Sequence, residues 1–393
     1  MVWMKQCRPA NLSIVLGLAF VLVLVYYTLY TERNASRIER VSLRLLLRTS
    51  ILAAIRGGNE VTRARQESMM RTWSKGKNQF GQDDPLTDGD LRSHRVILRT
   101  LLETFPRLNV ISEERDSSKS VAGAAAPATG APAPAGGGGA ASAAAAAAAV
   151  AASAGGATTV APPLEEVNLP ESISGYVDEK VRMTDVVVWV DPLDATQEYT
   201  EGLTSYVTTM VCIAVKGQAR IGVIHQPFAN RTVWAWVGQG PSKSLSSPDP
   251  AAGAAEQPDI PTVAKDIIYG QDPDADAATL RFIVSRSHAG TVEQFIKQTI
   301  TGNIRVTAAG GAGYKALQVA EGREHLYLHT TLIKKWDICA GAALLETLGG
   351  QMLTLQGDVI DFGPREEANR DGVLAYLNDK SEWSLLTAAS LPN

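Results

Sequence analysis

The sequence predicts a layered fold of mixed α-helices and β-strands. Val186 to Val190 form an unbroken apolar run, which is typical of a strand covered on both faces. Val41 to Gln66 place apolar residues three and four positions apart, the spacing of an amphipathic helix. Further helices and strands follow without a regular strand–helix–strand repeat. This mixture favours an α/β fold built of layers over a doubly wound parallel sheet.

The first half of the chain contains two predicted helices and five predicted strands. A polar stretch that ends in DDPLTDGD, Asp83 to Asp90, separates the two helices and carries no predicted element. The strands after Tyr206 form a pair that turns at Lys216 and Gly217, a dipeptide suited to a tight turn. The helices are Val41–Gln66 and Leu91–Phe105, and the strands are Asn109–Ser112, Val186–Val190, Tyr206–Lys216, Ala219–Gln226 and Thr232–Val237.

The second half begins with a polar loop, Gly240 to Asp276, that is rich in Pro and Asp. Short apolar runs after it predict strands, and segments with helical spacing lie between them. The predicted strands are Arg281–Ser285, Ile304–Thr307, Leu326–Leu328, Met352–Leu355 and Val373–Ala375. The predicted helices are Val292–Thr299, Gly310–Glu321 and Ile338–Leu348.

The N-terminus carries an uncharged apolar segment, residues 12–30, about as long as a membrane span. Tyr26, Tyr27 and Tyr30 lie at one end of it, as in an interfacial aromatic belt. No small-residue cleavage site follows, which favours an uncleaved transmembrane signal anchor. We therefore expect a short tail (1–11), the anchor (12–30), a stem (31–40) and one domain (41–393). Residues 117–163, rich in Ala, Gly and Pro, predict a disordered insert in that domain.

Two signals disagree on the orientation of this anchor. Lys5 and Arg8 precede the span, and five arginines follow it between Arg33 and Arg48, a bias that would keep the domain cytosolic. Two glycosylation sequons, at Asn34 and Asn230, are usable only in the secretory lumen. The residues alone leave the orientation open.

Charge and cysteine content exclude several classes of function. A net charge of −4 over 393 residues gives no bulk electrostatic case for binding nucleic acid. Cys7, Cys212 and Cys339 are too few and too scattered for a disulfide framework or a zinc site. Cys212 and Cys339 lie in apolar segments, so we expect both to be buried small hydrophobic residues.

Five acidic residues stand at the ends of predicted elements, where catalytic groups are usually mounted. Asp191 and Asp194 are only three positions apart, and carboxylates so close repel each other unless something positive lies between them. Oxygen ligands without His or Cys companions indicate Mg²⁺. Capping or solvated turn residues are the alternative for any single position. The residues are Asp90, Glu113, Asp191, Asp194 and Asp337.

Two separated motifs, WVDPLDATQEYTEG and WDICAGAALLETLGG, resemble the signatures of the lithium-sensitive, magnesium-dependent phosphatases that include inositol monophosphatase and fructose-1,6-bisphosphatase. An upstream Glu-Glu pair and LTDGD stand in the matching order. The resemblance runs from about Val41 to the C-terminus, excluding the insert. It implies an α-β-α-β-α sandwich, and residues 41–393 would be the phosphatase domain.

The resemblance also implies a role for each site residue. Two or three Mg²⁺ ions are expected per site. Asp90 and Thr196 would orient and deprotonate the attacking water. The SRSH and GGAGYK stretches match the nucleotide-handling part of the family. The implied metal ligands are Glu113, Asp191, the Leu193 carbonyl, Asp194 and Asp337, and the implied substrate contacts are Thr196, Ser287, His288, Gly311 and Lys315.

QEYTEG is similar to the branch that acts on 3′-phosphoadenosine 5′-phosphate, so the resemblance implies hydrolysis of its 3′-phosphate in the Golgi lumen. The expected partners are this small nucleotide and a membrane, without nucleic acid; a homo-oligomer is left open. The alternatives are an inositol phosphate phosphatase and a non-catalytic phosphate binder. The usual motif has Gly where Ala195 stands, a change that should fit if the backbone there avoids positive φ.

Overall fold

The computed structural model describes residues 18–27, 39–67, 72–77, 83–115, 173, 175–246, 279–286, 289–378, 383 and 386. Cys7, Asn34, Ser287, His288 and the predicted insert 117–163 lie outside these residues. Of the predicted membrane span, residues 18–27 are described: they form a helix with exposed apolar side chains. No helix in the described part of the chain is both long and apolar enough to cross a membrane.

A six-stranded sheet forms the first half of the domain. Its strands from β9 to β6 pair antiparallel, whereas β4 joins β6 in parallel. Val186, Val188 and Val190 of β6 face one core, and Val187 and Trp189 face another, so both faces of the strand are covered as predicted. In spatial order the strands are β10 (Gly240–Pro241), β9 (Arg231–Trp236), β8 (Gln218–Gln226), β7 (Thr208–Val215), β6 (Val186–Asp194) and β4 (Val110–Ser112).

A five-stranded sheet forms the second half. β11 pairs in parallel with β12 and β13, whereas β17 runs antiparallel to β13 and β15. This mixed pairing explains the lack of a regular repeat in the sequence. In spatial order the strands are β12 (Ile304–Ala309), β11 (Leu280–Ser285), β13 (Leu326–His329), β17 (Val373–Tyr376) and β15 (Gln351–Leu353).

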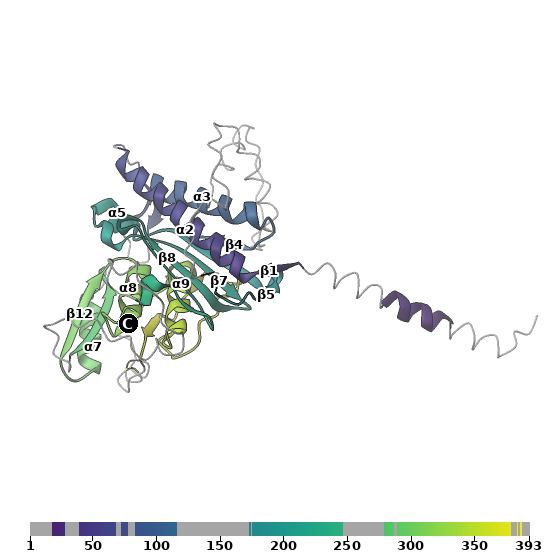
Figure 1. The fold of residues 1–393 in the computed structure, drawn as a ribbon. Helices are drawn as coiled ribbons and strands as arrows, with labels where there is room; N and C mark the ends of the chain where they lie inside the picture. The colour runs from purple at the N-terminus through teal and green to yellow at the C-terminus, as the bar shows by residue number, and fades with distance from the viewer. Residues whose placement is uncertain are drawn as a thin grey trace, which may run out of the picture.

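Helices separate and cover the two sheets, which gives the predicted α-β-α-β-α layers (Figure 1). α2 (Leu43–Gln66) and α3 (Asp88–Thr104) pack on the outer face of the six-stranded sheet. α8 (Ala312–Ala320) and α9 (Lys335–Thr347) lie between the sheets, and α7 (Ala289–Thr299) packs on β11 and β12. The apolar spacing that predicted α2 also explains its burial, because its apolar stripe faces the core between this helix and the six-stranded sheet.

Shorter elements connect these layers. Three two-stranded ladders pair antiparallel: β1 (Arg40–Ser42) with β5 (Lys180–Arg182), β2 (Thr72–Lys77) with β3 (Asp83–Thr87), and β14 (Ile333–Lys334) with β16 (Ala368–Asn369). The remaining helical turns are η4 (Met183–Asp185), α5 (Thr196–Glu201), η5 (Thr204–Tyr206), η6 (Pro227–Ala229) and α6 (Lys243–Ser246). The β2–β3 ladder falls in the stretch for which the sequence predicted no element.

The expectation of two unpaired cysteines is wrong. Cys212 of β7 and Cys339 of α9 are both buried, as predicted, but they form a disulfide with an S–S distance of 2.06 Å. The two residues are 127 positions apart in the sequence. Their contact depends on α9 crossing β7, a packing that spacing along the chain does not reveal.

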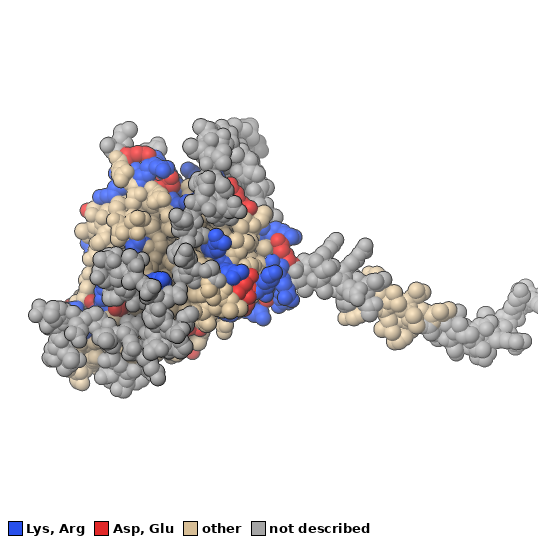
Figure 2. Space-filling view, in the orientation of Figure 1, with Lys and Arg blue, Asp and Glu red and all other residues tan. Residues whose placement is uncertain are grey.

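Charges of both signs are interspersed on the surface around β1 and β5, on the face that Figure 2 shows. Arg182 Nε lies 3.0 Å from Asp185 Oδ2, and Arg107 pairs with Glu39. Such exposed pairs contribute little to stability, about 0–1 kcal/mol each.

Candidate active site

Glu113 and Asp191 lie side by side because β4 ends where its parallel partner β6 leaves the regular ladder. β4 pairs with β6 so that Ser112 stands opposite Val190, and the Glu113 N–H donates to the Val190 carbonyl at 3.1 Å. The next residue on each strand is therefore a carboxylate at the same edge of the sheet. Asp191 is 1% exposed, so its carboxylate is withdrawn from bulk water.

Asp337 reaches the same point from the first turn of α9. Its Oδ2 accepts the Lys334 N–H at 3.0 Å, and the positive end of the helix favours a carboxylate there. Carboxylate oxygens of Glu113, Asp191 and Asp337 all lie within 4.8 Å of one another. Among the described residues, these three side chains form a group whose ligand atoms lie close enough together to hold a metal ion.

The electrostatics of the cluster fit a bound cation. Burial raises the pKa of Asp191 well above its usual value, and the charges of Glu113 and Asp194 raise it further. Burial and the same two neighbours raise the pKa of Asp337 in the same way. Three carboxylates at this separation, one buried and two half-buried, are stable in their charged form only with positive charge between them. A hard divalent ion with oxygen ligands would supply it.

Lys75 supplies positive charge at this site and was not predicted as a site residue. It lies on β2, where its Nζ is 2.8 Å from Glu113 Oε1 and also pairs with Glu114. Burial works to lower the pKa of Lys75, but the charges of Glu113 and Glu114 outweigh this effect and raise it. TWSKGK, the sequence of β2, is too polar to predict a strand, so nothing connected this lysine with the acidic residues.

Asp90 and Thr196 form a hydrogen-bonded pair at the end of β6. Thr196 Oγ1 lies 3.0 Å from Asp90 Oδ1 and 3.0 Å from the Leu193 carbonyl oxygen, so it can donate to either. Asp90 Oδ2 accepts the N–H of Thr87 at 2.7 Å, which fixes the carboxylate at the start of α3. Burial raises the pKa of Asp90 to about 6, although Lys75 acts in the opposite direction.

The Leu193 carbonyl is available because β6 loses its regular pairing near its end. The register with β7 shifts between Asp191 and Asp194. Ser93 Oγ donates to the Pro192 carbonyl at 2.7 Å, which ties this irregular segment to α3. The segment therefore turns peptide oxygens out of the sheet ladder, where one of them can serve as a ligand.

Asp194 lies outside the cluster of three carboxylates. Its Oδ1 accepts the Ala312 N–H at 3.1 Å, and its Oδ2 accepts the Gly313 N–H at 2.8 Å. Thr208 Oγ1 also donates to Oδ2, at 3.1 Å. Burial raises the pKa of Asp194, whereas Lys315 and the two backbone donors act to lower it. Asp194 thus anchors the N-terminus of α8 to the end of β6.

The condition under which an alanine fits at position 195 without strain, a backbone that avoids positive φ, is not met. Ala195 has φ +69° and ψ 43°, the left-handed region that favours glycine. The Tyr199 N–H donates to the Ala195 carbonyl at 2.8 Å, so Ala195 caps α5 in this conformation. The sharp turn is what sends Thr196 back towards Asp90, and an alanine tolerates it at a cost of about 1–2 kcal/mol.

Gly311 and Lys315 lie together at the start of α8. Gly311 has φ +66°, and a Cβ on it would lie 2.9 Å from Asp194 Oδ2 and 2.8 Å from the Tyr206 carbonyl oxygen. Lys315 is buried, and its Nζ donates to the Gly311 carbonyl at 2.6 Å. Burial lowers the pKa of Lys315 to about 8, against the effect of Asp194. The structure therefore places this ammonium beneath the glycine turn.

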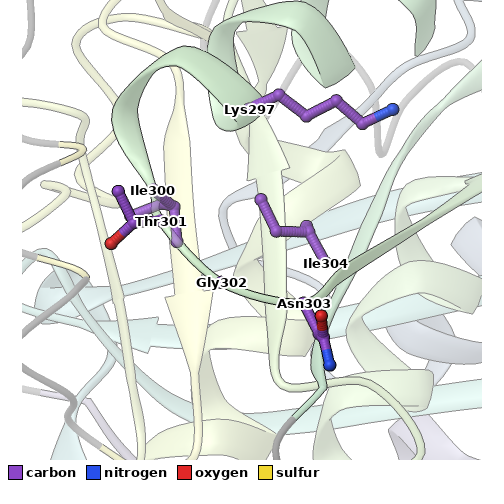
Figure 3. A pocket seen from close by; sticks show the side chains of 6 residues that line it. All are labelled: Lys297, Ile300, Thr301, Gly302, Asn303 and Ile304. Atoms are coloured by element: carbon purple, nitrogen blue, oxygen red, sulfur yellow. The ribbon is translucent and has the colours of Figure 1, made fainter.

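A surface hollow lies elsewhere, at the end of α7 (Figure 3). It is lined by Lys297 and by the turn from Ile300 to Ile304. Ile304 begins β12, whereas Gly310 and Gly311 follow the other end of that strand. The hollow and the start of α8 are therefore at opposite ends of β12, and the hollow holds none of the residues discussed above.

The inositol monophosphatase family model matches residues 42–390, which span both sheets and all the carboxylates above. The chain belongs to the inositol monophosphatase family. Members of this family are generally metal-dependent, and the Glu113–Asp191–Asp337 cluster could hold the metal.

Curated relatives in the inositol monophosphatase family carry two different names. "Inositol monophosphatase 3" of Danio rerio is 37% identical over 365 residues, covering 90% of this chain and 88% of the relative. "Golgi-resident adenosine 3′,5′-bisphosphate 3′-phosphatase" of Homo sapiens is 37% identical over 331 residues, covering 82% and 74%. At equal identity, these names point to two different substrates.

Solved structures of the family share the fold. The suhB protein of Bartonella henselae matches with a TM-score of 0.52 at 16% identity, covering 86% of this chain and 95% of that one. CysQ from Bacteroides thetaiotaomicron matches with a TM-score of 0.50 at 20% identity, covering 86% and 98%. The family model and these solved structures therefore both confirm the α/β fold predicted from the sequence.

Proposed function

We propose that the chain is a magnesium-dependent phosphatase that hydrolyses the 3′-phosphate of 3′-phosphoadenosine 5′-phosphate, giving AMP and phosphate. The observation that carries the proposal is the convergence of Glu113, Asp191 and Asp337 beside the Asp90–Thr196 pair. The three carboxylates can bind a cation, and the hydroxyl–carboxylate pair can take up and release a proton. Removal of this nucleotide, a by-product of sulfotransferases, would support sulfation.

Glu113, Asp191, the Leu193 carbonyl, Asp194 and Asp337 would hold two or three Mg²⁺ ions. When bound, these ions would neutralise phosphate charge and make water easier to deprotonate. Asp90 holds the Thr196 hydroxyl, and we assign this pair to orient the attacking water and accept its proton. A carboxyl whose pKa burial raises to about 6 is suited to accept a proton near neutral pH.

The adenosine part of the substrate would lie towards α8 and the segment after β11. We assign contacts to Thr196, Ser287, His288, Gly311 and Lys315. Arg286, the described residue before Ser287, pairs with Glu198 at 2.9 Å and Glu201 at 3.0 Å, which links this side of the site to α5. Because Lys315 is buried beneath Gly311, its charge would act on a bound anion through the glycine turn.

We further propose a single-pass membrane protein of the Golgi, with residues 12–30 as the anchor, Asn34 and Asn230 as glycosylation sites, and the domain in the lumen. Relatives named as Golgi-resident support the compartment. The Cys212–Cys339 disulfide supports a lumenal domain, since disulfides persist in oxidising compartments and are rare in the cytosol. Asn230 is exposed in a turn, where a glycan could be attached. Loss of a glycosidase-sensitive mass shift in Asn230→Gln would test this.

Inositol phosphate is the second candidate substrate, because relatives named inositol monophosphatase 3 are as similar as those named for the nucleotide. The test is phosphate release by the full chain from 3′-phosphoadenosine 5′-phosphate and from inositol 1-phosphate. Each substrate is assayed with Mg²⁺, with and without Li⁺. Asp191→Asn should abolish the activity, and Asp358→Asn, an exposed carboxylate, is the matched control.

Lithium-sensitive release from the nucleotide supports the proposal in full. Release from inositol 1-phosphate alone would keep the metal site and replace the substrate. If the folded protein released phosphate from neither, the chain would be a non-catalytic phosphate binder, and the proposed reaction would be wrong.

A further inference from the structure

The Cys212–Cys339 disulfide joins the two elements on which the carboxylate cluster depends. Cys212 lies in β7, the neighbour of β6, and Cys339 lies in α9. Both are at most 1% exposed, and their Cα atoms are 5.7 Å apart. α9 runs beneath the six-stranded sheet, so the bond fixes this helix to the sheet at one point (Figure 1).

That point is close to the cluster along both elements. Asp337 precedes Cys339 by two residues in the first turns of α9. On the other side, Met210 precedes Cys212 by two residues, and β7 pairs Met210 directly with Asp191. The covalent path from Asp337 to the strand beside Asp191 is therefore less than one helical turn and two strand residues long. The core also joins them here, because the ring of Trp336, next to Asp337, lies 6.3 Å from that of Trp189, two residues before Asp191, and the disulfide adds a covalent link to this packing.

A link to the sheet matters more at the start of α9, beside the carboxylate cluster, than along the rest of the helix. Oxygens of Glu113, Asp191 and Asp337 lie within 4.8 Å of one another, so in the metal-free protein the negative charge that Lys75 does not neutralise acts to push the start of α9 from the sheet. The first turn of the helix opposes this force through Trp336 and Ile338, which are buried in the core, but the next turn meets the sheet through Ala340, whose carbonyl packs against Gly222. Small side chains bury little area and give correspondingly little cohesion.

We propose that the disulfide positions Asp337 for metal binding, by holding the start of α9 against β7 while the site is empty. Cys212 and Cys339 are thus positioning residues of the cation site, in addition to stabilising the fold. This inference rests on the proposed function, since it concerns the same cluster. Without the bond, a fraction of the molecules would have Asp337 out of place, and each Mg²⁺ ion would have to restore it.

The test compares Mg²⁺ binding in the parent full-length chain and in Cys212→Ala/Cys339→Ala, by titration calorimetry well below both melting temperatures. Leu344→Ala is the control, because Leu344 is buried in the same helix at the end away from Asp337. It weakens the packing of α9 and leaves the disulfide intact. Cys212→Val/Cys339→Ala, which refills part of the lost volume, is the second variant if the first folds poorly.

We expect both disulfide variants to bind Mg²⁺ at least about fivefold more weakly, as when only about one molecule in five is competent to bind. Leu344→Ala should bind within about twofold of the parent at a similar loss of melting temperature. Amide hydrogens in the first turn of α9 should also exchange faster in the metal-free disulfide variants, and Mg²⁺ should restore their protection. If the disulfide variants and Leu344→Ala bound Mg²⁺ with equal affinity, the disulfide would act only as a stabilising cross-link, and the inference would be overturned. A parent that binds no Mg²⁺ would instead overturn the proposed function.

Discussion

Thr196 Oγ1 lies 3.0 Å from Asp90 Oδ1, although 106 residues separate them in the sequence. The contact links the first turn of α5 to the first turn of α3, at the point where β6 ends. Each partner is fixed by its own backbone: the left-handed turn at Ala195 directs Thr196, and the Thr87 N–H holds Asp90. A hydroxyl and a carboxylate held in this way form a pre-oriented site for handling a proton.

Removing either member of this pair should slow the reaction without emptying the site. We expect Thr196→Val and Asp90→Asn to lower kcat by about 10²–10⁴-fold, the usual contribution of a positioned proton acceptor. The dissociation constant for Mg²⁺, measured by calorimetry, should stay close to that of the parent. Thr200→Val is the matched control on α5, because the Thr200 hydroxyl donates to the Gln197 carbonyl within the same helix, at 2.7 Å. A Thr196→Val variant with parental kcat would remove this residue from the mechanism.

Lys75 and a metal ion should compete for Glu113. In the metal-free protein the Lys75 ammonium neutralises part of the cluster, and a cation that binds Glu113 must displace it. We expect Lys75→Met to bind Mg²⁺ several-fold more tightly. The metal-free variant should be less stable by about 1–3 kcal/mol, because buried carboxylates lose their partner.

Calorimetric titration and urea unfolding, both compared with Lys77→Met, would check these two effects. Lys77 is an exposed residue of the same strand, so its loss controls for a general change in surface charge. Weaker Mg²⁺ binding by Lys75→Met would show that the lysine assists the ion, contrary to the competition we expect.

Metal binding should release protons. Burial and mutual repulsion raise the pKa of Asp191 and of Asp337, so the metal-free site holds more protons at a given pH than free carboxylates would. A cation binds the ionised form, and its affinity should therefore rise with pH over the range in which these two carboxyls lose their protons. Calorimetry in buffers of different ionisation enthalpy gives the number of protons released, and zero release across this range would contradict the expectation.

The same pKa shifts set the sign of the pH dependence of stability. A carboxyl whose pKa is raised on folding binds more protons in the folded state, so its contribution to the free energy of unfolding falls as pH rises. The metal-free protein should accordingly lose stability towards alkaline pH, and saturating Mg²⁺ should oppose the loss. Melting temperatures measured as a function of pH, once with Mg²⁺ and once with a chelator, would give the pH dependence of each form.

The sequence predicted the elements whose pattern is local. An apolar run, helical spacing and a Lys-Gly turn identified β6, α2 and the β7–β8 hairpin, and the structure confirms all three. Asp337 was expected at the start of a helix, and α9 places it in the first turn. In each case a few neighbouring residues determine the outcome.

Features that depend on distant contacts were missed. The β2–β3 ladder is polar and forms beside the acidic cluster, so its sequence carries no apolar period, and Lys75 was overlooked with it. The disulfide needed the crossing of α9 over β7, which no spacing rule gives. Family motifs named Asp194 as a metal ligand, but only the structure shows that both its oxygens also accept N–H groups of α8.

Ala195 has φ +69°, in the left-handed region that favours glycine, which makes it a test of strain at the site. Ala195→Gly should raise the free energy of unfolding by up to about 1 kcal/mol, since relief of the left-handed strain exceeds the entropy that glycine adds to the unfolded chain. Lys216→Gly, at φ +53° in the β7–β8 turn, should stabilise the protein to a similar extent.

The two glycine variants should differ in catalysis. Ala195 separates Asp194 from Thr196, so a freer backbone there would loosen the proton-handling pair, whereas Lys216 touches no part of the site. We therefore expect Ala195→Gly to lower kcat a few-fold and Lys216→Gly to leave it unchanged. Urea unfolding and steady-state kinetics on both variants would check this. Should Ala195→Gly gain stability and keep full activity, the strain at Ala195 would have no role in holding Thr196 against Asp90.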